Sequence, residues 1–204
     1  MRIRTTETIK PEFRYIVNMV EPGSRVLDLG CGEGQLMKTL QKYKNARIQG
    51  IELSPEAVQE CVAKGLFVYQ GDLDEGLADF NDKSFDYVIL TSTLQVLHKP
   101  NLLIAEATRV GKKCIVSIPN FAYWRIRFQL MFNGVMPKTK SLPYEWYDSP
   151  NIHHTTIKDL TRLFKENNMK ILNQIHLVRW PGGCKKVKIF PNFFADYGIF
   201  EIER

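Results

Sequence analysis

The fold of this chain is decided by the stretch Val26-Leu27-Asp28-Leu29-Gly30-Cys31-Gly32-Glu33-Gly34. An apolar run typical of a buried strand ends here, three glycines follow at alternate positions, and a helical pattern begins at Gln35. A strand, a glycine-rich turn and a helix form the first crossover of a doubly wound α/β sheet, where nucleosides and dinucleotides bind. Because such a turn is tight and a ligand approaches its backbone, we expect a side chain at Gly30 or Gly32 to occupy the ligand's space.

The spacing of the glycines separates three cofactor classes. In the dinucleotide pattern G-x-G-x-x-G/A the third small residue would fall on Gln35, which is too large for close packing of helix on strand. A phosphate-binding loop requires Lys followed by Ser or Thr after the glycines, and this sequence has neither pair there. The pattern Asp28-x-Gly30-x-Gly32-x-Gly34 resembles the first motif of class I S-adenosylmethionine-dependent methyltransferases. That cofactor carries no phosphate, and its ammonium and sulfonium groups suit nearby carboxylates.

Acidic residues stand at the end of one further predicted strand and just after the end of another, in the order that this pattern requires. Glu52 ends a strand over 47–52 and lies 18 positions after Gly34, where an acid accepts hydrogen bonds from both ribose hydroxyls. Asp72 follows a strand over 67–70, and in the methyltransferase pattern this acid bonds the adenine amino group. A fourth strand is predicted over 85–90. The predicted cofactor site therefore consists of Asp28, Gly30, Cys31, Gly32, Gly34, Glu52, Leu53, Asp72 and Leu73.

Composition narrows the class of protein. The chain has 204 residues, 44% of them hydrophobic, and a formal net charge of +6 that is not gathered in one block. No apolar run approaches the ~18 residues of a membrane span, and the N-terminus has no apolar signal segment. The cysteines are scattered without a C-x-x-C pair: Cys31, Cys61, Cys114 and Cys184. We expect one methyltransferase-like domain over 1–204 in the reducing cytoplasm, without a metal site and without membrane contact.

The remaining patterns predict a mostly parallel, seven-stranded sheet with helices on both faces. Helices are expected over 11–20, 55–64, 100–110, 121–132 and 157–164, a buried strand over 114–118 and a further strand over 169–178. Thr156 and Asp159 have the spacing of a capping box. A turn is expected at 181–183, and short strands or a tail at 186–190 and 195–202.

Residues 121–154 interrupt this alternation and form a predicted insertion over the carboxyl end of the sheet, where such folds place substrates. Trp124, Phe128 and Phe132 share one face of the predicted helix, and Arg125 lies on another. Basic and aromatic residues together also occur in RNA-binding segments. The shared face favours packing of the aromatics on the sheet or on a protein partner, with solvated arginines, so we expect no nucleic-acid partner.

Five motifs spread along the chain are more specific than the fold. They are Gly30-Cys31-Gly32-Glu33-Gly34, Gly50-Ile51-Glu52, Thr93-Leu94-Gln95, Val116-Ser117-Ile118-Pro119-Asn120-Phe121-x-x-Trp124 and Leu142-Pro143-Tyr144-Glu145-Trp146-Tyr147-Asp148-Ser149-Pro150-Asn151-Ile152-His153. Over roughly residues 12–178 the chain resembles the methionine biosynthesis protein MetW family. The stretch 142–148 is the most distinctive.

The resemblance implies a partner protein more than an enzyme. It implies association with a homoserine O-acyltransferase, in the first place of the acetyl type, although the residues themselves do not distinguish acetyl from succinyl. It also implies S-adenosylmethionine or S-adenosylhomocysteine as ligand, with feedback as the use. The alternative is a methyltransferase that acts on a small-molecule acceptor. The sequence leaves a homo-oligomer open.

Candidates for catalysis are few, because methyl transfer from a sulfonium mainly needs a positioned nucleophile. The stretch Thr91-Ser92-Thr93-Leu94 lacks the Asn/Asp-Pro-Pro-Tyr/Phe pattern, which argues against methylation of nucleic-acid bases. His98 and His153 are candidate general bases, and Tyr144 a candidate wall of an acceptor pocket. His153 and His154 point apart as neighbours and do not suit a metal. Four basic residues are expected to form a solvated edge: Arg179, Lys185, Lys186 and Lys188.

Overall fold

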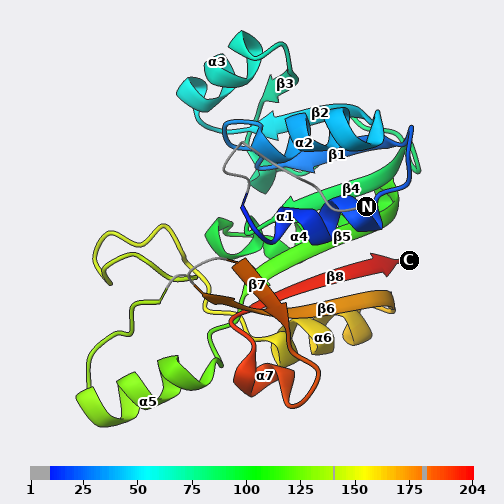
Figure 1. Ribbon diagram of the computed structural model, residues 1–204. Coiled ribbons are helices and arrows are strands. Elements are labelled where there is room, and N and C mark those ends of the chain that lie inside the picture. Colours follow the sequence, from blue (N-terminus) through cyan, green and yellow to red (C-terminus); the bar gives the residue numbers. More distant parts are fainter. Residues whose placement is uncertain (1–9, 140, 181–182) are drawn as a thin grey trace.

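The computed structural model describes residues 10–139, 141–180 and 183–204. These residues form one eight-stranded sheet in the order β3-β2-β1-β4-β5-β8-β6-β7, with helices on both faces (Figure 1). The strands are β1 (Arg25–Leu29), β2 (Arg47–Glu52), β3 (Phe67–Gln70), β4 (Phe85–Thr91), β5 (Gly111–Pro119), β6 (Lys170–Trp180), β7 (Gly183–Lys186) and β8 (Tyr197–Glu203). The neighbours from β3 to β5 pair in parallel, whereas β8 is antiparallel to β5 and to β6. The predicted doubly wound α/β fold is confirmed.

Two helical layers cover the sheet because its central strands β1, β4 and β5 are buried on both faces. On one face α1 (Phe13–Met19), α2 (Gln35–Lys44) and α3 (Pro55–Ala63) contribute side chains to a core that includes Val26 and Ile89. On the other face α4 (Pro100–Val110) and α6 (Ile157–Glu166) contribute to a core with Leu27 and Leu90. The alternation of neighbours such as Val26 and Leu27 between the two cores is the period of a strand.

The local signals at two helix starts act as the sequence predicts. The Ser54 hydroxyl accepts a hydrogen bond from the Ala57 amide at 3.2 Å, and Pro55 begins α3. Thr156 and Asp159 form a reciprocal capping box at the start of α6. Each cap satisfies amide groups that the helix itself leaves without partners.

The end of the chain differs from the prediction. The sheet has an eighth strand, β7, because residues 183–186 pair antiparallel with β6. Residues 186–190 were expected as a short strand or a tail, and of these only Lys186 lies in a strand. The turn predicted at 181–183 lies partly outside the described residues. The short helix α7 (Pro191–Phe194) had no sequence signal. β8, expected to be a short strand or a tail, is a buried central strand between β5 and β6.

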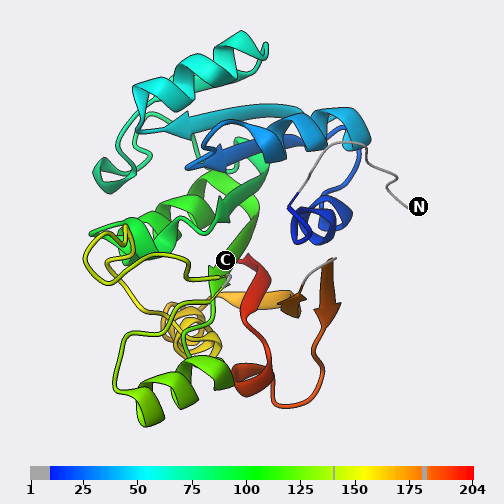
Figure 2. The same ribbon diagram turned by 60° about the vertical axis from the view of Figure 1, so that its left-hand side comes forward.

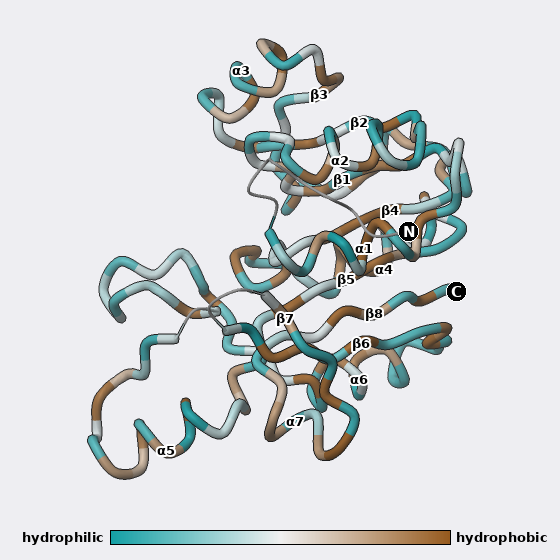
Figure 3. The backbone as a smooth tube through the Cα atoms, in the orientation of Figure 1, coloured by the Kyte–Doolittle hydropathy of each residue, from teal (hydrophilic) through white to brown (hydrophobic). Residues whose placement is uncertain are grey.

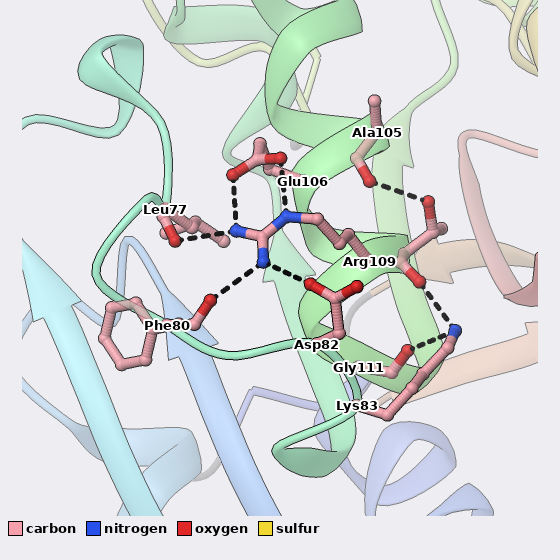
Figure 4. Close-up of polar contacts among 9 residues, drawn as sticks. Leu77, Phe80, Asp82, Lys83, Ala105, Glu106, Arg109 and Gly111 are labelled. Carbon is pink, nitrogen blue, oxygen red and sulfur yellow. Dashed lines mark hydrogen bonds and ion pairs between the residues drawn. The ribbon is translucent and has the colours of Figure 1, made fainter.

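An arginine of α4 fixes the long connection that leads from β3 to β4 (Figure 4). The Arg109 guanidinium donates to both carboxylate oxygens of Glu106 and to Asp82, and also to the main-chain oxygens of Leu77 and Phe80. All these donor–acceptor distances lie between 2.7 and 2.9 Å. The connection begins with a short 3₁₀ helix, η1 (Leu73–Glu75), so the residues beside the sheet's carboxyl edge are held in place.

The insertion contains the helix α5 (Trp124–Asn133), followed by an irregular segment. Figures 1 and 2 show α5 standing away from the sheet, beside α7. Its Phe128 ring stacks on Phe132 and meets Phe193 of α7 edge-on. The aromatic face of α5 therefore packs on itself and on α7 rather than on the sheet, and Phe132 stays 72% exposed.

Candidate functional site

The predicted cofactor residues meet where the strand order reverses. β1 lies between β2 and β4, and its carboxyl end leads into the turn Gly30–Gly34. In a parallel sheet this reversal leaves a crevice beyond the strand ends. Glu52 ends β2 beside it, and Thr93 follows β4 on the other side. The Thr93 hydroxyl donates to the Leu29 oxygen at 2.8 Å and so joins the ends of β4 and β1.

The glycines of the first turn have different neighbours. Gly30, Gly32 and Gly34 all have a positive φ, which side chains disfavour. A Cβ at Gly32 would meet nothing within 4 Å, so this position borders open space. A Cβ at Gly30 would lie 2.9 Å from Thr93, and one at Gly34 would strike Leu66. The expected steric role toward a ligand therefore fits Gly32, whereas Gly30 and Gly34 are required by packing within the protein.

Four amide groups of the turn are already used by the protein. The Gly30 and Cys31 amides both donate to the Ile51 oxygen, at 2.8 and 3.2 Å. The Gly32 amide donates to the Glu52 carboxylate at 2.8 Å, and the Gly34 amide donates to the Cys31 oxygen. A pyrophosphate site needs such amides free to bind the anion. This turn suits a ligand without phosphate.

Glu52 is held by three amides. One carboxylate oxygen accepts from Gly32, and the other accepts from Leu53 at 2.8 Å and from Ser54 at 3.1 Å. An ionised carboxylate offers about four acceptor positions, so it can still bond a hydroxyl group. The Leu53 side chain beside it is 61% exposed and offers an apolar surface.

Asp28 lies beneath the turn with its carboxyl group buried. Burial, and after it the nearby charge of Glu52, raises the pKa of Asp28 to about 7. A cation above the turn would stabilise the ionised form of Asp28 and lower that pKa. Burial also raises the pKa of the Cys31 thiol, which therefore stays neutral and does not act as a nucleophile at pH 7.

A cavity of about 550 Å³ lies over the first turn; we call it the first-turn cavity. Asp28, Gly30, Cys31 and Gly32 form part of its wall, and Lys10 and Lys38 are among the other lining residues. The remaining predicted residues lie outside it. Asp72 follows β3 and accepts a hydrogen bond from the Asp74 amide, and Leu73 is buried behind it.

A second cavity, of about 640 Å³, lies between the insertion and the carboxyl edge of the sheet; we call it the insertion cavity. Its walls come from Lys10, Pro11, Glu12, Ser92, Gln95, Val96, Ser141, Pro143, Tyr144, Pro150, Asn151, Arg179, Trp180, Gly183 and Tyr197. Lys10 lines both cavities, so the two are neighbours. The predicted placement of the insertion at the carboxyl edge is confirmed for this part.

A buried ionic network supports the insertion cavity. The Arg179 guanidinium donates to Glu12 at 3.1 Å and to Asp196 at 3.4 Å, and the Ser141 hydroxyl donates to Asp196 at 2.8 Å. Burial raises the pKa of Asp196, while Arg179 acts in the opposite direction. Arg179 was expected on a solvated edge; this is wrong, because only 16% of its side chain is exposed. The one sequence signal for the burial of Arg179 was its position beside an apolar strand pattern.

The three catalytic candidates lie in different surroundings. Tyr144 lines the insertion cavity. His153 is exposed, and its amide donates to the Gln95 oxygen at 3.0 Å. The exposed His98 follows η2 (Leu94–Val96), and its amide donates to Asp74. The structure therefore brings only Tyr144 to a cavity.

None of the helices in the described residues is long and apolar enough to cross a membrane. No group of three or more His, Cys, Asp and Glu side chains in the same part of the chain is arranged to hold a metal ion.

The comparison with known families decides the relationship. Residues 10–202 match the family described as methionine biosynthesis protein MetW. The chain belongs to the MetW family. The match is wider than the resemblance at 12–178 and includes β8. A MetXA/MetW relative from Rhodopirellula baltica, described as a bifunctional methionine biosynthesis protein, is 32% identical over 221 residues. The alignment covers all of this chain but 36% of that protein, so the chain spans about a third of that relative's length.

Similarity beyond the MetW family concerns methyltransferases. A demethylmenaquinone methyltransferase from Bacillus cytotoxicus is 27% identical over 170 residues, covering 74% of this chain and 72% of that protein. A solved S-adenosylmethionine-dependent methyltransferase from Thermotoga maritima has a TM-score of 0.70 at 19% identity, covering 95% of this chain and 87% of that one. One from Mesorhizobium loti has a TM-score of 0.70 at 16% identity, with coverages of 95% and 98%. The fold is that of class I S-adenosylmethionine-dependent methyltransferases.

Proposed function

We propose that this MetW-family chain binds S-adenosylmethionine or S-adenosylhomocysteine at its first turn and associates with a homoserine O-acyltransferase, which it supports. The observation that carries the ligand assignment is the first turn itself. Four of its amides are bonded within the protein, Gly32 faces open space, and two carboxylates lie at its edge. This combination suits a phosphate-free nucleoside with a cationic tail.

Each residue then has a role that follows from its position. Glu52 accepts hydrogen bonds from the ribose hydroxyls, and Leu53 covers one face of the adenine. Asp72 lies at the end of β3 for the adenine amino group, with Leu73 behind it. Asp28 faces the cationic amino-acid part of the ligand. Gly30, Cys31 and Gly32 lie between the two, and Gly34 closes the turn.

A matched pair of glycine variants tests this site. Gly32 and Gly23 both have a positive φ, and at both a Cβ would meet nothing within 4 Å. Gly32→Val and Gly23→Val therefore impose a similar backbone strain, but only the first fills the proposed ligand space. Calorimetric titration with S-adenosylhomocysteine should give at least a tenfold loss of affinity for Gly32→Val and less than a twofold change for Gly23→Val. Equal affinities would exclude the first turn as the binding site.

The partner assignment rests on exposed apolar side chains in the insertion. Phe132 on α5 and Trp146 in the following segment are 72% and 74% exposed, and Met131, Val135 and Tyr147 are also exposed. Figure 3 displays this concentration of hydrophobic residues along the outer end of α5 and beyond it. Large exposed aromatics are typical of protein interfaces, where they supply much of the binding energy.

The composition of the Rhodopirellula baltica relative supports the same partner. Its name joins MetXA and MetW, and the part aligned with this chain is 36% of its length. We take the MetXA part as the acyltransferase of the proposed pair, of the acetyl type. Two functions joined in one polypeptide are consistent with association of the separate chains in the cytoplasm.

Co-purification with the homoserine O-acyltransferase of the same organism tests the association. Phe132→Ser should remove most of the bound acyltransferase. Val62→Ser on α3, which is 60% exposed at the opposite end of the sheet, is the control and should retain it. If no complex forms with the unchanged chain, the partner assignment is refuted, while the ligand assignment stands on its own titration.

A methyltransferase acting on a small molecule is the second candidate. The observation in its favour is the insertion cavity, which adjoins the first-turn cavity and contains Tyr144. S-adenosylmethionine would supply a methyl group on a sulfonium, and the chain would position and desolvate the acceptor. Incubation with methyl-labelled cofactor and a metabolite extract should then yield a labelled small product. Absence of any product, with the cofactor bound, would exclude this candidate.

A further inference from the structure

Two residues that line the insertion cavity each have a buried side-chain oxygen without a hydrogen-bond donor among the described residues. The oxygens are Oε2 of Glu12 and Oε1 of Gln95. Both residues belong to the cavity lining, and they are only 4% and 5% exposed. A buried acceptor without a donor destabilises the fold by roughly 1–3 kcal/mol, and more if it is charged. A hydrogen-bond donor therefore belongs beside each of these oxygens.

The charges around Glu12 indicate that the donor is a cation. Arg179 is shared between two carboxylates, because it donates to Oε1 of Glu12 and to Asp196. Asp196 also accepts from the Arg179 amide and from the Ser141 hydroxyl. Glu12 is thus left with one bonded oxygen and one free oxygen. Lys10 contacts the Phe13 ring instead, with its nitrogen 5.5 Å from the ring centre. The two acids and one guanidinium form a buried group that lacks one positive charge.

Gln95 is oriented so that its free oxygen cannot be relieved by rotation of the amide. Its Nε2 group donates to the Ser92 oxygen at 2.7 Å, which fixes which end of the amide is the acceptor. Its main-chain oxygen accepts from the Ile152 and His153 amides and so holds the insertion against the sheet. The acceptor at this wall is therefore built into the contact between the insertion and the end of β4.

Other residues of the cavity lining are apolar. Tyr144 and Trp180 contribute aromatic rings, and Pro143 and Pro150 contribute hydrocarbon. The ammonium of Lys185 already lies 4.6 Å from the Trp180 ring centre, so this ring offers its edge and remaining surface to a hydrocarbon body rather than a face to a second cation. A ligand that suits both kinds of lining has an ammonium group at one end and a short hydrocarbon body.

We propose that the insertion cavity is a second small-molecule site, which binds a compound with a primary ammonium group. The ammonium donates to Glu12 and Gln95, and the hydrocarbon body lies against Tyr144 and Trp180. The site does not require the first turn to bind a cofactor, nor α5 to bind a partner. The same recognition serves an effector molecule or an acceptor of a methyl group.

Ligand-observed NMR titration of the full chain at pH 7 with three probes of one length tests the proposal. The probes are pentylamine, which is protonated at this pH, 1-pentanol and pentanoate. Pentylamine should bind at least tenfold more tightly than either of the others. Equal binding of pentylamine and pentanol would mean that water alone satisfies the two oxygens, and stronger binding of pentanoate would give the site the opposite charge preference. Either result overturns the proposal.

Variants locate the binding. Glu12→Gln should reduce the preference for pentylamine over pentanol to less than threefold. Glu21→Gln, which removes the same charge from a residue that is 71% exposed and pairs with Lys113, should leave the preference unchanged. If circular dichroism shows that Glu12→Gln is unfolded, Gln95→Met removes the other acceptor and leaves the Glu12–Arg179 pair intact. A preference that survives in the folded variant places the amine elsewhere and refutes the assignment.

Discussion

Replacement of Glu52, at the end of β2, by glutamine separates ligand binding from folding more sharply than a change within the first turn. Glu52 accepts three amide hydrogen bonds, from Gly32, Leu53 and Ser54. In Glu52→Gln the amide oxygen can keep the Leu53 and Ser54 bonds. The new amide nitrogen then faces the Gly32 amide, so that bond is lost, together with the negative charge offered to the ribose.

The magnitude follows from the bonds that change. Loss of a hydrogen bond to a charged group weakens binding by about 1.5–3 kcal/mol, which is roughly 10- to 100-fold in affinity. The Gly32 bond is also made to a charged group, so its loss lowers the free energy of unfolding by about 1.5–3 kcal/mol, which for a chain of this size lowers Tm by roughly 3–12 °C. The variant is therefore expected to fold and to bind poorly.

Titration calorimetry with S-adenosylhomocysteine measures the first effect, and thermal unfolding without ligand measures the second. Glu166→Gln is the control: Glu166 lies on α6, on the other face of the sheet, and neither it nor its partner Arg162 lines either cavity. It should bind within twofold of the unchanged chain. A folded Glu52→Gln variant with unchanged affinity would show that the end of β2 does not hold the ribose, and the assignment of the site would be wrong.

Three further changes test other parts of the structure. Asp28 has a folded-state pKa of about 7 against 3.8 in the unfolded chain. The free energy of unfolding should therefore fall by on the order of 3–4 kcal/mol as pH rises from 4 to 7. Urea unfolding should show this pH dependence in the unchanged chain and not in Asp28→Asn. Binding of S-adenosylmethionine at pH 6.5 should release protons from Asp28, and a binding enthalpy that does not depend on the buffer's ionisation enthalpy would contradict this. Arg109→Leu should lower the free energy of unfolding, measured in urea, by about 2–3 kcal/mol, because the main-chain oxygens of Leu77 and Phe80 lose charged donors. An unchanged urea midpoint would refute the role of Arg109 in holding this connection. Gly30→Ala should lower Tm through its contact with Thr93, whereas a drop in ligand affinity without a drop in Tm would mean that Gly30 faces the ligand instead.

The first half of the fold could be predicted because its signals are local. The run 25–29 alternates between two buried faces, has the acid Asp28 at its next-to-last position and leads into glycines with positive φ. Ser54 and Thr156 cap their helices through residues three positions away. Such patterns depend on neighbours in the chain, so the sequence contains them in full.

The second cavity could not be predicted because its network joins distant residues. Glu12 and Arg179 are 167 positions apart, and Asp196 reaches Arg179 only because β8 inserts between β5 and β6. A lysine or arginine near a chain end is usually solvated, so Arg179 gave the wrong expectation. β7, the strand that the sequence did not predict, had no alternating pattern of its own, and it forms by pairing with β6.

The insertion shows the same limit in another form. The shared face of Trp124, Phe128 and Phe132 was correctly recognised as aromatic, but periodicity does not say what covers such a face. In the structure it meets α7, whose four residues gave no helical signal, and its outer end is left exposed.

We propose that this chain supports a homoserine O-acyltransferase and responds to S-adenosylmethionine. The activity of the same organism's acyltransferase tests this, measured at fixed concentration with and without the chain, and then with increasing S-adenosylmethionine. Activity should rise with the chain to a saturating ratio and fall as the cofactor is added, and this fall should be absent in Glu52→Gln. Activity that is identical in all series would contradict the claim and would leave methyl transfer to a small molecule as the function to pursue.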